Sequence, residues 1–364
     1  MADNTQSSYR WDPELVETGG RHVAIALDAS PHSRTALSSA LVVLRKDADR
    51  LTLIMVLHHK HGLVAKALQA TGLAHDNVHP LADEQDYADF LVAFKDAAGI
   101  GRPYPTANLT GDEADDAVFA GEALDAAVDS GFDAVLDVII SSKPKNALLD
   151  YAERSRANAA RCPGGDECVR PGFVHDPIDL LVLGSRGRSG ISSWLLGSVS
   201  ASLAKLAPLP TMIAKAPLPY DVACNDGPAK WMVAMDMRPE GFPSSLRAVA
   251  SLVPIIRPDD TLILLSVLSV EEAVGVSDDQ YEKRPAKALF NSLPAVLADY
   301  GITARTEFQV GHPGSQICAV ADAEGIDVLA LGCRDSTADG MFALGSVSQH
   351  VVTHAEVPVV WISK

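Results

Sequence analysis

Glycine, arginine and serine residues after an apolar run in the first half of the chain have the types and spacing of a phosphate site. Two residues separate Gly184 from Gly187, nine separate Gly187 from Gly197, and Ser198 follows directly. Glycines at such a turn permit positive φ and let backbone N–H groups approach an anion that a β-carbon would keep away. A helix beginning near Ser198 would direct its free N–H groups and the positive end of its dipole to the same point. The turn therefore predicts phosphate binding.

Polar side chains around this turn fit a nucleotide. Arg186 and Arg188 place two positive charges beside the glycines. The Ser198 hydroxyl can donate a hydrogen bond to a phosphate oxygen. Asp28 follows the first apolar run and can accept from an adenine amino group or a ribose hydroxyl. The competing interpretation is that Asp28 caps a helix and the glycines serve packing; the complete turn favours the nucleotide.

The second half of the chain repeats the first, which predicts two similar units. The segment that begins at Asp179 aligns without a gap with the segment that begins at Asp327, and both contain the pentamer LGSVS. The opening of each unit repeats less closely, since HVAIALDAS from His22 matches WMVAMDMRP from Trp231. Each unit therefore opens on a strand that is followed by an aspartate.

The elements that position these residues follow from the pattern of apolar runs. Runs without polar alternation, such as LTLIMVL and LLVLG, predict strands buried on both faces. Helical patterns over 33–46, 146–157 and 198–207 separate the runs. The alternation predicts an α/β fold of two tandem, doubly wound, Rossmann-like domains with parallel sheets. Ligands of such sheets bind beyond the carboxyl ends of the strands, where Asp28 and Gly184 both fall.

The repeat also predicts the domain boundaries. The first unit has about 60 more residues than the second between its opening aspartate and its glycine turn, and we interpret these as insertions. The predicted segments are a tail over 1–20, a first domain over 21–217 with insertions near 60–115 and 156–177, a linker over 218–230, and a second domain over 231–364.

Composition excludes several classes of protein. The 364 residues include 30 Lys and Arg against 47 Asp and Glu, a net charge of −17 that repels nucleic acids and anionic membranes. No apolar run reaches the roughly 20 residues of a membrane span. The first twenty residues carry no secretory or organellar signal. With five scattered cysteines that lack metal-type spacing, a cytoplasmic protein is expected.

With these motifs in this order, the chain resembles the universal stress protein family, as a tandem two-domain member. The resemblance implies an adenine nucleotide alpha-hydrolase-like fold. In the ATP-binding branch of the family, the opening aspartate and a valine of the second strand contact adenine, while the glycine turn holds ribose and phosphates. The candidate ATP site of the first domain comprises Asp28, Val56, Gly184, Arg186, Gly187, Arg188, Gly197 and Ser198.

The second unit departs from this pattern because Asp335 replaces the middle glycine. A carboxylate there faces the phosphates at a cost of about 1 to 4 kcal/mol, although a bridging Mg²⁺ would reverse the sign. We expect weak ATP binding or none, and we interpret Asp236 as a helix cap. Ser198 and Ser346 are also candidate N-caps. The degenerate second site comprises Asp236, Val267, Gly332, Asp335, Gly345 and Ser346.

The sequence predicts a nucleotide-binding protein more strongly than an enzyme. It has no GxxxxGK[ST] loop, no GxGxxG after the first strand and no GxSxG elbow. We identify no catalytic residue and no metal site, so at most slow ATP hydrolysis is expected. The primary interpretation is that ATP, with or without Mg²⁺, acts as a conformational or assembly signal in a stress response. The alternatives are an interaction scaffold that binds no nucleotide and a slow Mg²⁺-dependent ATPase.

The closing strands suggest how the two units join. The family commonly dimerises through this strand, so PTMIA (210–214) and PVVWI (358–362) are expected to pair within one chain as an internal pseudo-dimer. A further homodimer stays open. The sequence identifies neither a protein partner nor the stress that is sensed.

Overall fold

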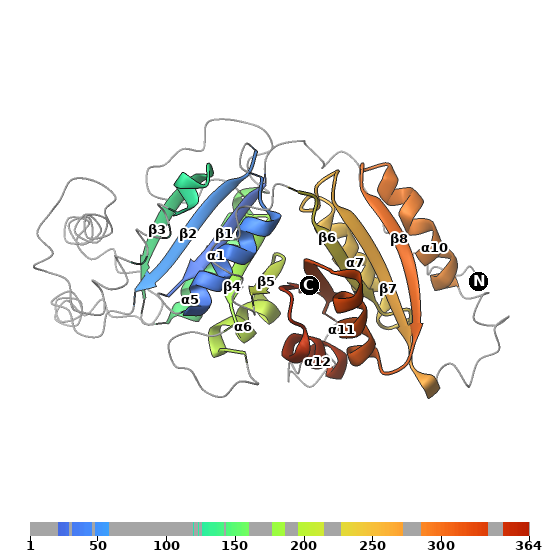
Figure 1. Ribbon diagram of the computed structural model, residues 1–364. Helices are drawn as coiled ribbons and strands as arrows, with labels where there is room; N and C mark the ends of the chain where they lie inside the picture. The colour runs from blue at the N-terminus through green and yellow to red at the C-terminus, as the bar shows by residue number, and fades with distance from the viewer. Residues whose placement is uncertain are drawn as a thin grey trace, which may run out of the picture.

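The computed structural model contains one ten-stranded sheet with helices on both of its faces (Figure 1). The strand order is β3-β2-β1-β4-β5-β10-β9-β6-β7-β8. No helix among the described residues is long and apolar enough to cross a membrane. The structure describes residues 21–28, 31–45, 48–57, 119, 123, 126–141, 143–159, 177–185, 196–214, 227–271, 285–333 and 345–363.

The first unit alternates strands and helices as the apolar runs predicted. All of its strands are parallel. Helix α5 runs to Ala159, so the first residues of the predicted loop over 156–177 are helical instead; the rest of that loop up to residue 176 lies outside the described residues. The elements are β1 (His22–Leu27), α1 (Pro31–Val43), β2 (Arg50–Leu57), β3 (Asp133–Ile140), α5 (Pro144–Ala159), β4 (Leu180–Gly184), α6 (Ser198–Leu206) and β5 (Thr211–Ala214).

The second unit repeats this order of strands. Its sheet runs β8-β7-β6-β9-β10, which corresponds to β3-β2-β1-β4-β5 of the first unit. The predicted doubly wound, mostly parallel α/β fold is therefore confirmed. The elements are β6 (Lys230–Met235), α7 (Phe242–Leu252), β7 (Thr261–Leu268), α10 (Pro285–Ala298), β8 (Thr303–Val310), α11 (Pro313–Glu324), β9 (Val328–Gly332), α12 (Ser346–His354) and β10 (Val359–Ile362).

The closing strands β5 and β10 join the two units at the centre of the sheet. They pair antiparallel, with Val359 opposite Ile213 and Trp361 opposite Thr211. Both strands are buried along their whole length. The pairing within one chain that the sequence suggested is therefore present, and it covers two apolar strands that would otherwise be open edges.

The hydrophobic core consists of two layers, one on each face of the sheet. Helices α1, α7 and α10 contribute to one layer, with Leu37, Val249 and Phe290 among its buried residues. Helices α5, α6, α11 and α12 contribute to the other, which includes Leu203 and Val351. Because each layer runs through both units, the strands between them must be apolar on both faces, as their sequences are.

Each unit also buries an aspartate directly before its second strand, a feature that the sequence analysis missed. Asp49 accepts hydrogen bonds from the backbone N–H of Arg21 at 2.9 Å and from its guanidinium. Arg21 also donates to the carbonyl of Ile255 in the second unit. Asp260 accepts from the guanidinium of Arg257 at 3.0 Å in the same way. Asp260 also accepts from the N–H of Ala229, directly before β6, at 2.7 Å, so each aspartate connects the starts of the first two strands of its unit.

His22 at the start of β1 makes the protein sensitive to acid. Burial, together with the nearby Arg50, lowers the pKa of His22 to about 4, and its Nε2 lies 2.7 Å from Thr52 Oγ1. A histidine with a depressed folded pKa binds its proton more readily when unfolded, so stability falls as pH drops from 6.5 to 4. We expect a loss of about 3 kcal/mol over this window.

The control is His22→Gln, which keeps a polar side chain but does not titrate in this range. Urea unfolding of both proteins at several pH values gives the difference in their free energies of unfolding. That difference should change between pH 6.5 and 4. Parallel curves for the two proteins would show that His22 does not titrate as expected.

Candidate functional site

Three of the predicted site residues meet where the strand order of the first unit reverses. Asp28 follows β1, Val56 lies near the end of β2, and Gly184 ends β4. Leu27 is paired with Met55, and Ala26 with Leu183, so these residues occupy neighbouring positions at the carboxyl ends of three adjacent strands. This is the switch point at which open α/β sheets bind ligands.

The carboxylate of Asp28 is held against the first turn of α1. Ser33 Oγ donates to Asp28 Oδ1 at 2.6 Å and accepts from the Asp28 N–H at 2.9 Å. The reciprocal bonds fix the carboxylate beside the carboxyl ends of β1 and β2. Ser33 is not among the predicted site residues, although a hydroxyl five residues after Asp28 was a signal in the sequence.

Gly184 is required by a close contact, which corrects the expectation of a positive φ. It is not among the described glycines with positive φ. A β-carbon on Gly184 would lie 2.6 Å from the backbone oxygen of His32, so a side chain there would separate α1 from β4. Ser200 Oγ of α6 donates to the Gly184 carbonyl at 2.7 Å. Gly184 thus brings α1 and α6 together at the end of the strand.

Helix α6 begins with a glycine at its N-cap. Gly197 is the cap, with φ −57° and ψ 150°, and no side chain makes a capping hydrogen bond. Ser198 is the first helical residue, so its predicted role as the N-cap is wrong. Without a side-chain cap, the N–H groups of the first turn have no acceptor within the helix, and an anion can fill that role.

The corresponding turn of the second unit has the same backbone. Gly345 caps α12 with φ −56° and ψ 152°, again without a side-chain hydrogen bond, and Ser346 is the first helical residue rather than the N-cap. A β-carbon on Gly345 would meet no atom within 4 Å. Neither its conformation nor any contact with a described residue therefore requires a glycine at this position.

The aspartate of the second unit is held by an arginine. Arg238 makes a bidentate pair with Asp236, with Nε 2.9 Å from Oδ1 and Nη2 2.9 Å from Oδ2. The predicted helix cap is wrong, because α7 begins after Gly241 and no side chain caps it. Ser245 lies nine residues after Asp236 but Ser33 only five after Asp28, so the second loop is four residues longer. Arg238 lies in this longer loop.

The remaining predicted residues divide between described and undescribed positions. Val56 and Val267 are half-buried and pack against the same core layer. A β-carbon on Gly332 would lie 2.4 Å from the backbone oxygen of Ser244, the same relation as Gly184 has to His32. Among the described residues, no group of three or more His, Cys, Asp or Glu side chains could hold a metal ion. Arg186, Gly187, Arg188 and Asp335 lie outside the described residues.

A family model and a curated relative that match parts of the chain both belong to the universal stress proteins. The model of the universal stress protein family matches residues 175–215 and 230–363, slightly less than half of the chain. A curated relative, a universal stress protein of Methanocaldococcus jannaschii, is 25% identical over 105 residues, which cover 28% of this chain. The alignment covers 65% of the relative, a little under two thirds of its length.

A solved structure that aligns over nearly the whole chain has the same fold. A universal stress protein from Archaeoglobus fulgidus has a TM-score of 0.54 at 18% identity, and the alignment covers 94% of this chain and 98% of that one. An Arabidopsis thaliana universal stress protein family structure with AMP bound matches 38% of this chain and 92% of its own, at 25% identity and a TM-score of 0.29. The fold is thus the Rossmann-like one of the Archaeoglobus fulgidus protein, and the chain is similar to universal stress proteins over the residues that the family model matches.

Proposed function

We propose that the chain binds ATP in its first unit and that the nucleotide acts as a conformational or assembly signal in a stress response. The observation that carries the proposal is the meeting of Asp28, Val56 and Gly184 at the switch point of the first sheet. Asp28 would accept a hydrogen bond from the adenine amino group or from a ribose hydroxyl, and Val56 would contact the base. The nucleotide would lie across the ends of β1, β2 and β4.

The start of α6 suits the phosphates of such a nucleotide. The N–H groups after Gly197 lack a side-chain cap and carry the positive end of the helix dipole. The matching N-cap of the second unit, Gly345, has the same backbone conformation, and a β-carbon there would meet no atom within 4 Å. Phosphate oxygens fit such a turn because the glycine lets them approach the backbone closely. Arg186 and Arg188 would add positive charge, and Mg²⁺ would screen the phosphates when bound.

The second unit is expected to bind ATP weakly or not at all. Its Asp236 carboxylate is already paired with Arg238 through two hydrogen bonds. To accept a bond from adenine, Asp236 would have to give up part of a charge-assisted pair. Asp335 adds a carboxylate where the first unit has a glycine. We therefore propose one nucleotide per chain.

The test is ATP titration of the full chain by calorimetry, with and without Mg²⁺, after mass analysis of any nucleotide that copurifies. One site per chain is expected. Asp28→Ala should weaken ATP binding roughly ten- to a hundredfold, because it removes a hydrogen bond to a charged acceptor. Gly187→Asp should weaken it comparably. The matched control is Asp236→Ala, which should leave the affinity of the first site unchanged.

The interaction scaffold and the slow ATPase each predict a different outcome of these measurements. If no nucleotide copurifies and ATP does not bind, the proposal is wrong and the interaction scaffold becomes the better interpretation. Magnesium-dependent release of phosphate that Asp28→Ala removes would identify a slow ATPase. Two equivalent sites per chain would contradict the proposed weakness of the second unit. If Asp28→Ala binds as tightly as the parent, the site has been assigned to the wrong residues.

A further inference from the structure

Strand β8 forms one end of the described sheet and pairs with a described strand, β7, along one side. Its residues alternate between the two faces. Phe308 faces α10, where its ring lies 6.0 Å from that of Phe290 and 5.3 Å from Lys287 Nζ. Arg305 faces α11 and pairs with Glu324 at 2.7 Å. The apolar side chain of Phe308 thus lies on one face of β8, and the charged side chain of Arg305 lies on the other.

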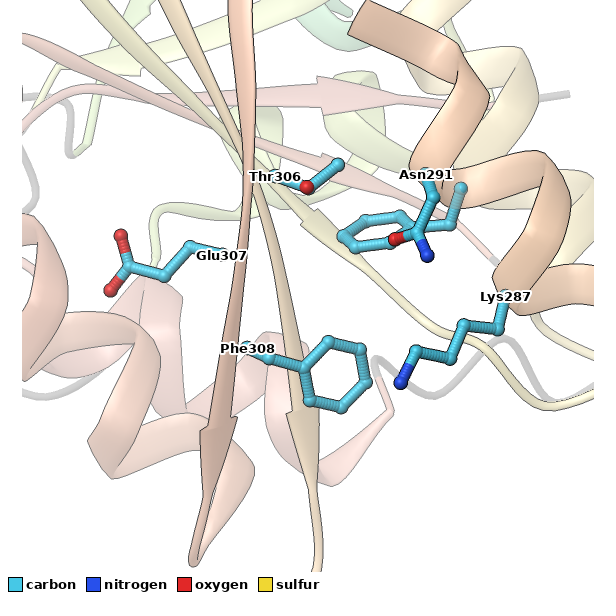
Figure 2. A pocket seen from close by; sticks show the side chains of 6 residues that line it. Lys287, Asn291, Thr306, Glu307 and Phe308 are labelled. Carbon is cyan, nitrogen blue, oxygen red and sulfur yellow. The ribbon is translucent and has the colours of Figure 1, made fainter. Parts of the chain in front are cut away.

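An open pocket lies along this edge of the sheet. It has a volume of about 310 Å³ and is formed between α10 and β8. Figure 2 shows Phe308 and Lys287 on one side of the strand and Glu307 on the other. An aromatic ring, Phe308, and a carboxylate, Glu307, thus lie on opposite faces of the strand. The lining residues are Lys287, Phe290, Asn291, Thr306, Glu307 and Phe308.

We propose that two copies of the chain associate through β8, as antiparallel strands related by a two-fold axis at Thr306. An open strand edge is a template for pairing, and a two-fold axis closes the assembly at a dimer. In this register Thr306 lies opposite its own copy, and Arg305 lies opposite Glu307 of the second copy. The inference is independent of nucleotide binding, because β8 lies at the far end of the second unit.

Charge favours the register centred on Thr306 over the register centred on Glu307, in which the two strands overlap equally well. A two-fold axis perpendicular to the sheet pairs residues of the same face, and strands over Thr303–Val310 overlap best when centred on Thr306 or Glu307. Centring on Glu307 would place two carboxylates directly opposite each other, which is destabilising. Centring on Thr306 gives two Arg305–Glu307 pairs, and it sets the large Phe308 against the small Ala304.

The other end of the described sheet lacks this complementarity. Strand β3 carries Asp133 and Asp137 and no basic residue. Asp133 pairs with Arg50 of the neighbouring strand β2 at 3.5 Å, but β3 itself has no basic residue to lie opposite Asp133 or Asp137 of a second copy. Pairing of β8 with β3 would join unlike edges and form open chains of molecules rather than closed dimers. Self-pairing of β8 is the arrangement that these charges favour.

The first test is sedimentation equilibrium of the full chain over a range of concentrations. The parent should show a monomer–dimer equilibrium. Arg305→Glu should raise the dimer dissociation constant roughly tenfold or more, because both Arg305–Glu307 pairs become repulsive. Glu307→Arg should do the same. The double variant R305E/E307R restores opposite charges across the axis and should regain most of the affinity.

Within one chain, Arg305 pairs with both Glu307 and Glu324, each at 2.7 Å. The double variant restores the pair with Glu307 in the chain as well as the pairs across the axis, so urea unfolding of the monomer accompanies each dissociation constant. A dimer lost in a single variant whose monomer keeps its free energy of unfolding, and regained in the double variant, reports on contacts between copies. The matched control is Arg50→Glu, which changes an exposed charge near the opposite end of the sheet and should leave the dissociation constant unchanged. A parent that stays monomeric, or a dimer unaffected by the single variants, would overturn the proposal.

A cysteine at the axis tests the register. Opposed residues of antiparallel strands have Cα atoms about 4.5–5.5 Å apart, within the range of a disulfide. Thr306→Cys should give a disulfide-linked dimer on mild oxidation, beyond any that the parent forms through its own cysteines. Ala304→Cys, which lies opposite Phe308, should not. If the Ala304→Cys variant forms linked dimers more readily than the Thr306→Cys variant, the register is wrong.

Discussion

Replacing Asp49 with alanine is expected to lower the free energy of unfolding by about 3–5 kcal/mol, because it leaves the Arg21 guanidinium buried without its counter-charge. The side chain of Asp49 is completely buried and that of Arg21 is 4% exposed. Asp49 also accepts the backbone N–H groups of Arg21 at 2.9 Å and of Arg45 at 2.6 Å. The substitution therefore removes the partner of a buried charge and of two backbone donors.

The contribution of Asp49 should also disappear in acid. Burial alone would raise the pKa of Asp49, but the hydrogen bonds and charge of Arg21 outweigh burial and hold the pKa below its ordinary value of 3.8. A carboxylate with a depressed folded pKa stabilises the fold at pH values above its unfolded pKa. That contribution is lost as pH falls below about 4, through the folded pKa.

The control is the exposed pair of Arg50 and Asp133, whose side chains are 49% and 72% exposed. Asp133→Ala should cost less than about 1 kcal/mol, as for surface ion pairs in general. Guanidinium unfolding at pH 7 compares the two variants with the parent. Equal small losses would mean that the Arg21–Asp49 pair contributes no more than a surface pair. Because Arg21 also contacts the carbonyl of Ile255, the transition should report on both units.

The strands and the joining of the units could be predicted because their signals are local or repeated. Buried parallel strands must be apolar on both faces, so runs such as LTLIMVL identify β2 directly. The repeat identified β5 and β10 as equivalent, and two equivalent apolar strands can cover each other. The candidate site followed from the same logic, since the carboxyl ends of β1 and β4 must meet in a doubly wound sheet.

The roles of single residues were harder to predict because they depend on contacts between distant segments. Gly184 was expected to permit a positive φ, but its role is to let the backbone of His32 approach β4. The pairing of Asp236 with Arg238 depends on the course of a loop. A count of loop lengths would have shown that the second loop is longer, although not which side chain it directs to the carboxylate.

The buried aspartates carried a signal that was overlooked. Asp49 directly precedes β2, and Asp260 directly precedes β7, the equivalent strand of the second unit. A charged residue repeated at the edge of two buried strands indicates a shared structural role. Their partners were not predictable, because Arg21 lies 28 residues before Asp49 whereas Arg257 lies three residues before Asp260. Both carboxylates also accept the backbone N–H of the residue directly before the first strand of the unit, so only the source of the guanidinium differs between the two units.

Two glycines of the second unit are expected to respond differently to the same substitution. Gly332→Ala would place a β-carbon 2.4 Å from the Ser244 oxygen and 2.8 Å from its carbonyl carbon. Both atoms belong to the backbone of α7, so the helix must move away from β9. Overpacking of this kind costs about 1–3 kcal/mol, and the rigid contact places Gly332→Ala at the upper end of that range.

Gly345→Ala is the matched control, because its β-carbon would meet nothing within 4 Å and its φ of −56° suits an alanine. Loss of glycine flexibility from the unfolded chain should stabilise the variant by up to about 1 kcal/mol, and the poorer N-cap propensity of alanine should cost about as much, so the expected net change is close to zero. Urea unfolding of both variants measures the contrast. Equal effects would show that the close approach of α7 to β9 is not what requires Gly332. A stable Gly345→Ala would mean that folding alone does not require Gly345, as expected if the glycine at this turn serves a ligand.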